Sequence, residues 1–566
     1  MEKGQRLIRT SIPVLNSKDI KLGKEGQIYR SWSVTPGDFF RIYKDEPLYL
    51  EVNFREDLKA PKVVLYTDML SKGKEWSEIE FEKVTPNNFR ISVNPKRCGI
   101  FQFKIKHSPD NGKSWFWDRV PFTKVIVDPA GAKDIRMYTL LPTATGNITA
   151  WKRELTHIKN LGFNMIHLLP ITAMDESESP YAAADLFDVD HSFRDAADKR
   201  GALEQFEDFV EVAKENGIRL CMDLVLNHIG IKSNVARMKP EWLIPDRNES
   251  DSLMRAGCWH MNKWIKWEDL VKINYDHPEE HVRKELTEYM KQYALFWANY
   301  AAYTGGMVRF DNLHSSHTGF IYDLILTLRK KYPELVIQAE FFSDSNTLLK
   351  TASECELNLL LANPWEHPFA EDLRDYISYL HEISPELLFL NPLTTHDTGA
   401  PAQLYGKAEA AIPRYFALAL MGTGQTGIVQ GTEHGVLEKI EFIGRNRSAA
   451  YPEMNRYSDM IRKINGLHNR FPLFHQGRNI RFVDGKHGAV LACIREDKKG
   501  DQKVLLAANM DTTGEHMVTL DLTPLAAVIE KVKLTDAFSG QSFMVDSDMM
   551  DVLIEPCGVR AFIVGR

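Results

Sequence analysis

The chain has 566 residues, of which 44% are hydrophobic and 26% are charged, and its formal net charge at pH 7 is −7. These totals are typical of a globular protein of roughly two to four domains. They exclude the strong positive charge expected of a protein that binds nucleic acid or an anionic membrane, so we expect neither as a partner.

The six cysteines are scattered along the chain without close paired spacing. This pattern predicts neither a zinc site nor a disulfide framework. The first residues contain no apolar signal segment, and no run of about eighteen apolar residues follows. Free thiols without an export signal favour a cytoplasmic protein.

The N-terminal residues 1–132 are predicted to form a β-sandwich. Residues 48–53 and 101–106 alternate between apolar and polar side chains, which is typical of half-buried strands. The sequence Asp-Asn-Gly at 110–112 predicts a hairpin turn. Trp115 and Trp117 share one face of the following strand. We expect their side chains to pack within the sandwich, and a sugar-binding platform stays open as the alternative.

Residues 133–475 alternate between short apolar strands and amphipathic helices. We predict eight strands, which start near residues 136, 164, 218, 307, 335, 356, 387 and 427. Helices are predicted between them, including 148–161, 202–215, 279–300, 318–330 and 408–420. Eight strand–helix units predict an α/β fold with a closed (β/α)₈ TIM barrel. A long insertion after the third strand, residues 229–276, is expected to form a lobe beside the barrel mouth.

Residues 476–566 return to a strand pattern and are predicted to form a C-terminal β-sandwich. Apolar runs at 488–494 and 504–509 read as two strands. The charged segment 495–503 between them is expected to be a solvated hairpin loop.

Three carboxylates stand at or shortly after predicted barrel strands. Asp311 ends the run GMVRFD, Glu340 ends LVIQAE, and Asp397 ends LFLNPLTTHD. Parallel strands of a closed barrel bring such residues to one face of the molecule. Paired carboxylates of this kind are typical of enzymes that cleave glycosidic bonds.

Arg309 lies two residues before Asp311, so both side chains are expected on the same side of the strand. We expect the guanidinium to keep Asp311 ionised, as a nucleophile requires. Partial burial and nearby anions are expected to raise the pKa of Glu340, which suits a general acid. A lone carboxylate after a strand is more often a cap or a turn residue, but three at barrel strand ends favour chemistry.

Four segments resemble the signature motifs of the α-amylase family of glycoside hydrolases. They are DLVLNH at 223–228, VRFD at 308–311, AE at 339–340 and HD at 396–397. The resemblance covers roughly residues 135–475 and implies a retaining mechanism. It implies Asp311 as nucleophile, Glu340 as acid/base and Asp397 as transition-state stabiliser. The positions that it implies for substrate binding are Tyr181, Asp223, His228, Arg309, His314 and His396.

Further segments resemble one branch of that family, the glucanotransferase half of eukaryotic-type glycogen debranching enzyme. They are NMIH at 164–167, DNLHSS at 311–316 and AEFF at 339–342. The resemblance implies transfer of a short α-1,4-glucan piece between chains. A chain of 566 residues has no room for the second, α-1,6-glucosidase half, so we expect a stand-alone transferase or a hydrolase on a related barrel.

The sequence departs from the family pattern at a few positions. Thr395 replaces a common Asn, and His314 and Ser315 replace a common Lys and His, which leaves the choice of acceptor open. Asn227 matches a residue that binds calcium in many amylases. One amide does not make a metal site, so we predict no metal and no cofactor. We expect Glu433, after the eighth strand, to be structural or to belong to an outer subsite.

The leading functional prediction is a 4-α-glucanotransferase of glycogen or maltodextrin metabolism, with an α-glucan or maltooligosaccharide as substrate. An amylase-type hydrolase, a maltosyltransferase that uses a sugar phosphate donor, and an inactive glucan-binding protein stay open as alternatives. The sequence predicts no oligomeric state.

Overall fold

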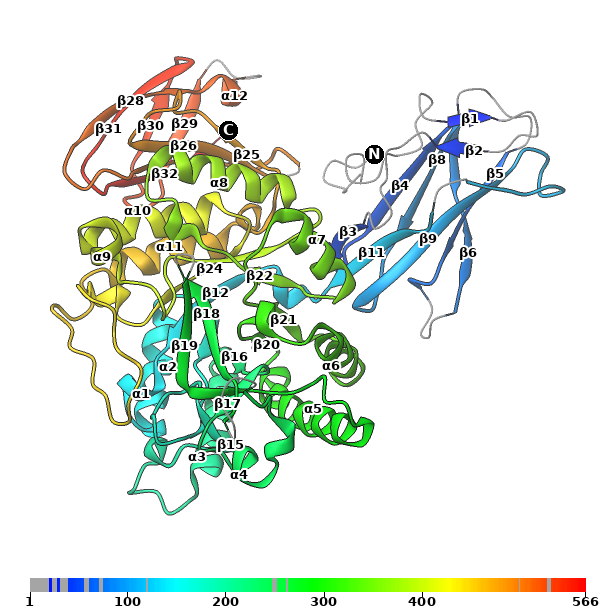
Figure 1. The fold of residues 1–566 in the computed structure, drawn as a ribbon. Helices are drawn as coiled ribbons and strands as arrows, with labels where there is room; N and C mark the ends of the chain where they lie inside the picture. Colours follow the sequence, from blue (N-terminus) through cyan, green and yellow to red (C-terminus); the bar gives the residue numbers. More distant parts are fainter. Residues whose placement is uncertain are drawn as a thin grey trace. The chain divides into compact units, whose positions relative to one another are not determined.

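The computed structural model describes residues 20–22, 28–30, 39–54, 61–70, 75–118, 121–246, 252–260, 263–497, 499–526 and 531–565. The chain separates into two compact units (Figure 1), which are described in turn. The first unit contains Met1–Lys133, Ser343–Asn358 and Ile383–Leu388. The second contains Asp134–Phe342, Leu359–Glu382 and Phe389–Arg566.

The first unit contains two facing β-sheets. The larger has the strand order β3-β11-β9-β5-β6, with β10 paired to β9, and the smaller has the order β4-β8-β7. Side chains from both sheets form one apolar core, which confirms the predicted N-terminal β-sandwich. The strands are β3 Phe39–Tyr43, β4 Leu48–Asn53, β5 Lys62–Thr67, β6 Ser77–Glu80, β7 Glu82–Thr85, β8 Asn88–Val93, β9 Gly99–Ser108, β10 Phe116–Trp117 and β11 Thr123–Asp128.

The second unit is built on a closed barrel of eight parallel strands, as predicted. Each strand starts within three residues of the position expected from the sequence. The strands are β12 Ile135–Leu140, β13 Met165–Leu168, β16 Arg219–Leu224, β20 Met307–Phe310, β21 Val336–Ala339, β22 Leu359–Leu361, β23 Phe389–Pro392 and β24 Gln425–Val429.

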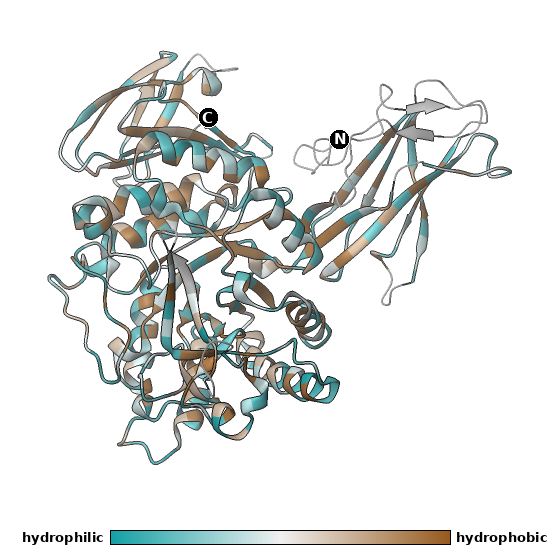
Figure 2. Cartoon of the chain, viewed as in Figure 1, coloured by the Kyte–Doolittle hydropathy of each residue, from teal (hydrophilic) through white to brown (hydrophobic). Residues whose placement is uncertain are grey.

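The barrel strands are short, and nearly all of their residues are buried. This is expected where helices cover the outer face of a parallel sheet and side chains fill the interior. Gly306 lets β20 begin close beside β16, since a Cβ at this position would lie 2.0 Å from the Leu220 carbonyl oxygen. In Figure 2 the strands at the centre of this unit are largely brown, in keeping with their apolar composition.

Helices follow the strands where the sequence predicts them. They include α2 Ile148–Asn160, α3 Ala202–Glu215, α5 Glu280–Tyr303, α6 Thr318–Lys331, α8 Ala370–Ile383 and α11 Ser458–Arg470. Asn147 caps α2, since its side chain accepts a hydrogen bond from the backbone N–H of Ala150. The predicted helix 408–420 is divided into a 3₁₀ turn, α10 Ala411–Phe416 and a π-helical turn, Ala417–Met421.

The insertion after the third barrel strand forms a small sheet of its own. Its strands are β17 His228–Gly230, β18 Arg255–His260 and β19 Lys263–Lys272, in the order β17-β19-β18. The predicted inserted lobe is therefore confirmed.

The C-terminal residues form a six-stranded sheet with the order β25-β26-β27-β32-β29-β30 and a pair, β28-β31, which share an apolar core. This confirms the predicted C-terminal β-sandwich. The strands are β25 Ile480–Phe482, β26 Val490–Glu496, β27 Lys503–Asn509, β28 His516–Asp521, β29 Val532–Asp536, β30 Ser542–Val545, β31 Met549–Ile554 and β32 Val559–Gly565. The domain boundaries at residues 132 and 475 stay predictions.

One sequence-based expectation fails in this sandwich. Arg495 was expected in a solvated loop, but it lies inside β26 and its side chain is fully buried. Its guanidinium donates to the carbonyl oxygens of Leu420 and Gly422 at 2.8 and 2.7 Å, in and just after the π-helical turn. It also donates to the Asn479 side chain. These neutral acceptors replace the solvation that the charge loses on burial.

Among the described residues, no helix is both long enough and apolar enough to cross a bilayer.

Candidate active site

The candidate site is organised around the buried guanidinium of Arg309 on β20. Its Nη1 donates to both carboxylate oxygens of Asp223 at 2.7 Å and to Oδ1 of Asp311 at 3.0 Å. Its Nη2 donates to Oε2 of Glu340 at 2.9 Å. Three of the residues singled out from the sequence therefore bond to the same cation.

The barrel strands bring these side chains together. Asp223 on β16 is in register with Arg309 on β20, so both side chains point into the barrel. Asp311 and Glu340 each follow their strand directly, and their backbone N–H groups still donate to the preceding strand, to Leu224 and Phe310 respectively. Both carboxylates therefore lie at the carboxyl ends of the strands, where sites of this fold occur.

The backbone just after Asp311 adds a further contact. Asn312 has a left-handed conformation, with φ of 45°, and its N–H donates to Oε2 of Glu340 at 2.9 Å. Asn is among the residues that adopt this conformation most readily. The turn that ends β20 therefore also holds the carboxylate that ends β21.

A chain of close polar contacts links Asp397 to the same cluster. Oδ2 of Asp397 lies 3.1 Å from Nε2 of His396, which lies 2.7 Å from the hydroxyl of Tyr181. That hydroxyl donates to Oδ2 of Asp223 at 3.0 Å, so it accepts its other bond from the His396 N–H. The Tyr181 and His396 rings stack at 5.6 Å, whereas the Asp397 side chain is 56% exposed.

The electrostatics differ from the expectation that Arg309 keeps Asp311 ionised. Burial raises the pKa of Asp311 well above its usual value, and Glu340 and Asp223 add repulsion that Arg309 offsets only in part. Burial alone would also raise the pKa of Asp223, but Arg309 and His167 outweigh it and hold that pKa below its usual range. One guanidinium shared by three carboxylates therefore leaves the cluster with an affinity for a proton.

The predicted histidines have different surroundings. Burial lowers the pKa of both His228 and His396 to about 4, so both are neutral at pH 7 and suited to hydrogen bonds with an uncharged ligand. The His228 ring lies 6.1 Å from the ring of Trp267 in the inserted lobe. His314, by contrast, is exposed on the 3₁₀ turn Leu313–Ser315 and is not one of the residues bonded to the Arg309 cluster.

Two further residues of the cluster were not chosen from the sequence. Nε2 of His167 on β13 lies 3.2 Å from Oδ2 of Asp223. Gln338 on β21 is in register with Arg309 and is 1% exposed, and neither atom of its side-chain amide has a hydrogen-bond partner. A small cavity is lined by Gln338 together with His167, Arg309, His396 and Asp397. In the sequence, the one feature that could have identified His167 and Gln338 is that each is a polar residue inside an otherwise apolar strand.

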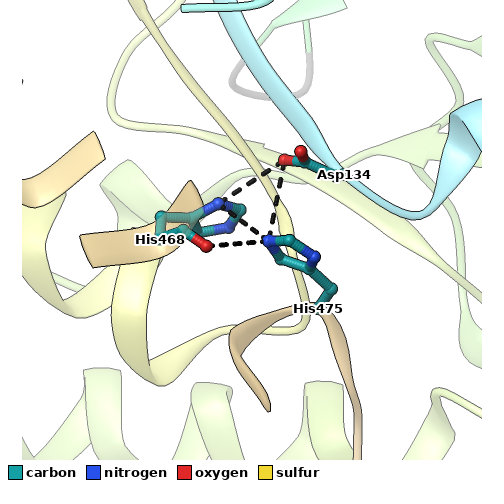
Figure 3. Close-up of side chains that lie close together, drawn as sticks. All are labelled: Asp134, His468 and His475. Atoms are coloured by element: carbon teal, nitrogen blue, oxygen red, sulfur yellow. Dashed lines mark hydrogen bonds and ion pairs between the residues drawn. The ribbon is translucent and has the colours of Figure 1, made fainter. Parts of the chain in front are cut away.

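A group of metal-ligand type residues, Asp134, His468 and His475, lies outside this site (Figure 3). Nδ1 of His468 lies 3.0 Å from Nη1 of Arg136, which can only donate, so Nδ1 is an acceptor. Nε2 of His475 lies 2.9 Å from the carbonyl oxygen of His468, so it carries a proton. Neither lone pair is free, and a guanidinium already occupies the position of a cation.

A second such group contains His157, Glu433 and His434. Nδ1 of His434 accepts the backbone N–H of Asn455 at 2.8 Å, so its Nε2 carries the proton and faces Oε1 of Glu433 at 3.4 Å. The hydroxyl of Tyr138 donates to the same oxygen at 2.6 Å. Glu433 is fully buried among these donors and joins the loop after β24 to α2 and β12. The group is a hydrogen-bond network, as a structural role for Glu433 requires.

Comparison with known families gives one match to a family model. Residues 130–245 match the model described as glycogen debranching enzyme, glucanotransferase domain. This stretch contains β12, β13 and β16 with Tyr181, Asp223 and His228. It ends before Asp311 and Glu340.

Relatives among characterised proteins include two α-1,4-glucan:maltose-1-phosphate maltosyltransferases. The protein of Arcanobacterium haemolyticum is 23% identical over 449 residues, which cover 71% of this chain and 61% of the relative. That of Corynebacterium pseudotuberculosis is 24% identical over 493 residues, which cover 78% of this chain and 69% of the relative. The chain thus spans about three fifths to two thirds of the length of these relatives.

Solved structures with the same fold include an α-amylase from Geobacillus thermoleovorans in complex with acarbose and a debranching enzyme from Nostoc punctiforme. The TM-scores are 0.62 and 0.59, both at 17% identity. Each covers 77% of this chain, and 99% of each neighbour is covered. Together with the family model and the relatives, these neighbours confirm that the chain is similar to the α-amylase family of glycoside hydrolases and, within it, to the glucanotransferase domain of glycogen debranching enzyme.

Proposed function

We propose that this protein is a retaining, α-glucan-active enzyme that cleaves α-1,4-glucosidic bonds and transfers the released piece to another glucan, as a 4-α-glucanotransferase. The observation that carries the proposal is the bonding of Asp223, Asp311 and Glu340 to one guanidinium at the carboxyl ends of β16, β20 and β21. This arrangement supports paired carboxylates that act on one glycosidic bond.

In the proposed mechanism the proton that the carboxylate cluster holds lies on Glu340 when the substrate is bound. Ionised Asp311 then attacks the anomeric carbon while Glu340 donates that proton to the leaving glycosidic oxygen. The bond between the anomeric carbon and that oxygen breaks, and a glycosyl ester to Asp311 forms. Glu340, now ionised, takes a proton from the acceptor hydroxyl, which attacks the same carbon and releases Asp311. Two inversions leave the α configuration unchanged. This chemistry predicts a separation of about 5–5.5 Å between the two carboxyl groups.

The remaining residues are proposed to bind the sugar in the cleaved position. Tyr181 and His396 present stacked rings, and His228 and His396 are neutral donors or acceptors for hydroxyl groups. Asp397 is more exposed than the other carboxylates, which leaves its oxygens accessible to ring hydroxyls. We propose that it stabilises the oxocarbenium-like transition state. His314 is proposed to contact the acceptor.

The proposed setting is the cytoplasm, and the proposed substrate is an α-glucan or maltooligosaccharide. The names of the relatives, which transfer maltose, and the glucanotransferase family model favour transfer over hydrolysis by water. Cys98, Cys221, Cys355, Cys493 and Cys557 are free thiols, which supports a reducing compartment.

The names of the relatives also favour a second candidate, maltosyl transfer from maltose-1-phosphate. The covalent step would be the same, but inorganic phosphate would leave in place of a glucan chain. A polar groove lined by Asn227, Lys272, Asp276, Ser315 and His317 offers one cation to such a group, beside one carboxylate.

Incubation with maltotetraose tests the first proposal directly. Transfer yields oligosaccharides longer than the donor without a rise in reducing ends, whereas hydrolysis yields shorter products and new reducing ends. Chromatography of the products and a reducing-end assay distinguish the two outcomes. A parallel incubation with maltose-1-phosphate and glycogen tests the second candidate, because only that reaction releases inorganic phosphate. Absence of any product from either donor would refute both candidates.

A further inference from the structure

A cluster of exposed aromatic side chains lies on the larger sheet of the N-terminal sandwich. We call it the aromatic platform, and it consists of Tyr66, Trp76, Trp115, Trp117 and Phe122. Trp76 and Trp115 are each 38% exposed, Trp117 is 41% exposed and Phe122 is 42% exposed. The expectation that Trp115 and Trp117 pack within the sandwich is therefore wrong.

The strand register explains why these rings point outward. On β5 the buried core residues Val63 and Leu65 alternate with Tyr66, which belongs to the opposite face. On β10, Trp117 pairs with Lys106 of β9, and paired residues of antiparallel strands share a face. Lys106 alternates with the core residue Ile105, so Trp117 lies on the outer face with Tyr66.

The rings of the platform support one another. Tyr66 and Trp76 stack with their centroids 4.5 Å apart and their planes 17° apart. The Trp76 ring meets Phe122 edge-on at 5.1 Å, and Tyr66 meets Trp117 edge-on at 5.4 Å. Such mutual contacts fix the rings before any ligand binds, which lowers the entropy cost of binding.

Polar groups lie between the rings, and Glu78 neutralises one of the two lysines among them. Nζ of Lys106 lies 4.8 Å from the centre of the Trp115 ring and pairs with Glu78 at 2.5 Å. Nζ of Lys104 lies 5.4 Å from the centre of the Phe122 ring. Nucleic acid would require a clear excess of positive charge, which a paired lysine does not supply. Aromatic faces with interspersed donors and acceptors suit an uncharged, hydroxyl-rich ligand.

The size of the platform argues against a second protein as its occupant. An aromatic side chain has about 150–250 Å² of surface, so four rings exposed to about two fifths present roughly 250–400 Å². A stable protein interface needs about 800 Å² from each partner. Exposed patches of about 300–600 Å² on monomers are often functional, which favours a narrow ligand such as one polysaccharide chain.

We propose that the aromatic platform binds α-glucan chains at a site made of residues other than the barrel carboxylates. The C–H bonds on one side of a glucopyranose ring form an apolar face that stacks on Trp or Tyr. Its hydroxyl groups find partners in Lys104, Lys106 and Glu78. The identity of the ligand rests on the proposed function, whereas the existence of the site rests on the exposed rings.

The aromatic platform should affect the binding of long glucan polymers but not that of short oligosaccharides. A platform that holds one segment of a long glucan raises the local concentration of the remaining chain near the enzyme. A short maltooligosaccharide occupies one site at a time and gains nothing. The platform therefore lowers the KM for glycogen without changing kcat or the KM for maltotetraose.

The test uses the full chain with the double substitution Trp76→Ala and Trp117→Ala. We expect retention on glycogen to weaken about tenfold or more and the KM for glycogen to rise in parallel. We expect kcat and the KM for maltotetraose to stay unchanged. Phe369→Ala, which removes a ring that is 69% exposed in the other unit, serves as the matched control and leaves all four quantities unchanged.

The possible outcomes separate this proposal from the proposed function. If the wild type processes maltotetraose but the double variant retains glycogen as well as the wild type, only the platform is refuted. If the wild type neither binds glycogen nor processes maltotetraose, both proposals fail. A change of sedimentation coefficient in the variant would identify a second copy as the occupant and overturn the platform. Should the double variant unfold, the single substitution Trp117→Ala on the short strand β10 is tested in the same way. We then expect a smaller loss of retention on glycogen and a smaller rise of the KM for glycogen.

Discussion

Arg309 and Arg495 are two of the buried arginines of the second unit, and their surroundings are opposite in kind. Arg309 in the barrel bonds to three carboxylates, Asp223, Asp311 and Glu340. Arg495 in the C-terminal sandwich donates to backbone carbonyl oxygens and one amide, all of them neutral. One site has a surplus of negative charge, and the other has none.

The comparison separates a group that organises chemistry from one that organises structure. Neutral dipoles solvate Arg495 well enough to keep it charged, although burial lowers its pKa to about 10. Around Arg309 three carboxylates share one guanidinium, and burial together with repulsion from Glu340 and Asp223 raises the pKa of Asp311. An excess of like charge inside a protein destabilises the fold, and it is typical of functional sites.

The largest expected effect comes from removing the proposed nucleophile. Asp311→Asn keeps the shape of the side chain but cannot form the glycosyl ester, so turnover of maltotetraose should fall by about 10³-fold or more. Circular dichroism should show an intact fold. A loss of less than about tenfold in a correctly folded variant would reject Asp311 as the nucleophile.

The next largest effect is expected from substitution of Arg495, which should lower the free energy of unfolding without changing kcat. Arg495→Met leaves the carbonyl oxygens of Leu420, Gly422, Leu473 and Gln476 without a donor, so the free energy of unfolding should drop by about 3–5 kcal/mol. Denaturant titration measures this drop, and kcat of the folded fraction should stay at the wild-type value. Arg309→Met supplies the contrast, since it should abolish turnover. If both variants lost activity alike, the distinction between the two arginines would be wrong.

The smallest expected effect is a pH dependence of the melting temperature that comes from Asp311. Because the folded pKa of Asp311 lies above the unfolded value, the native state holds a proton that the unfolded state has lost, and ionisation at higher pH destabilises the fold. Asp311→Asn stays neutral, so it should melt at a higher temperature than the wild type at pH 7.

This gain should shrink as the pH falls through the folded pKa of Asp311. Thermal unfolding at a series of pH values measures it. Asp459→Asn, at an exposed carboxylate on α11, should give no gain at any pH. A constant difference between Asp311→Asn and the wild type at all pH values would contradict the assigned titration.

The barrel could be predicted from the sequence because its strands carry a strong local signal. Each is a short, mainly apolar run, and the helices between them have a clear apolar face, so the sequence predicts the start of all eight strands to within three residues. The convergence of Asp311 and Glu340 followed from the parallel direction of β20 and β21 alone. The contact between Arg309 and Asp311 followed from their spacing of two residues, whereas the ionisation of Asp311 expected from that contact did not.

The remaining features depend on contacts that no local pattern encodes. Arg495 stands in a charged segment, and only the π-helical turn far away in the sequence supplies its acceptors. The outward direction of Trp117 depends on its pairing with Lys106, and the pKa of Asp311 depends on how many carboxylates share one cation. His167 and Gln338 looked like ordinary strand residues until the register placed them beside Asp223 and Arg309.

The left-handed turn at Asn312 gives the site a property that separate loops could not supply. Its backbone N–H fastens the Glu340 carboxylate to the residue next to Asp311, and Arg309 fastens both from the other side. The spacing between the Asp311 and Glu340 carboxylates, the proposed nucleophile and acid/base, is therefore held by one short stretch of covalent chain. Thermal motion of the loops at the barrel rim would move the Asp311 and Glu340 carboxylates together, so the distance between them would stay almost constant. Substrates of different length could then bind and leave without disturbing the arrangement of these two carboxylates.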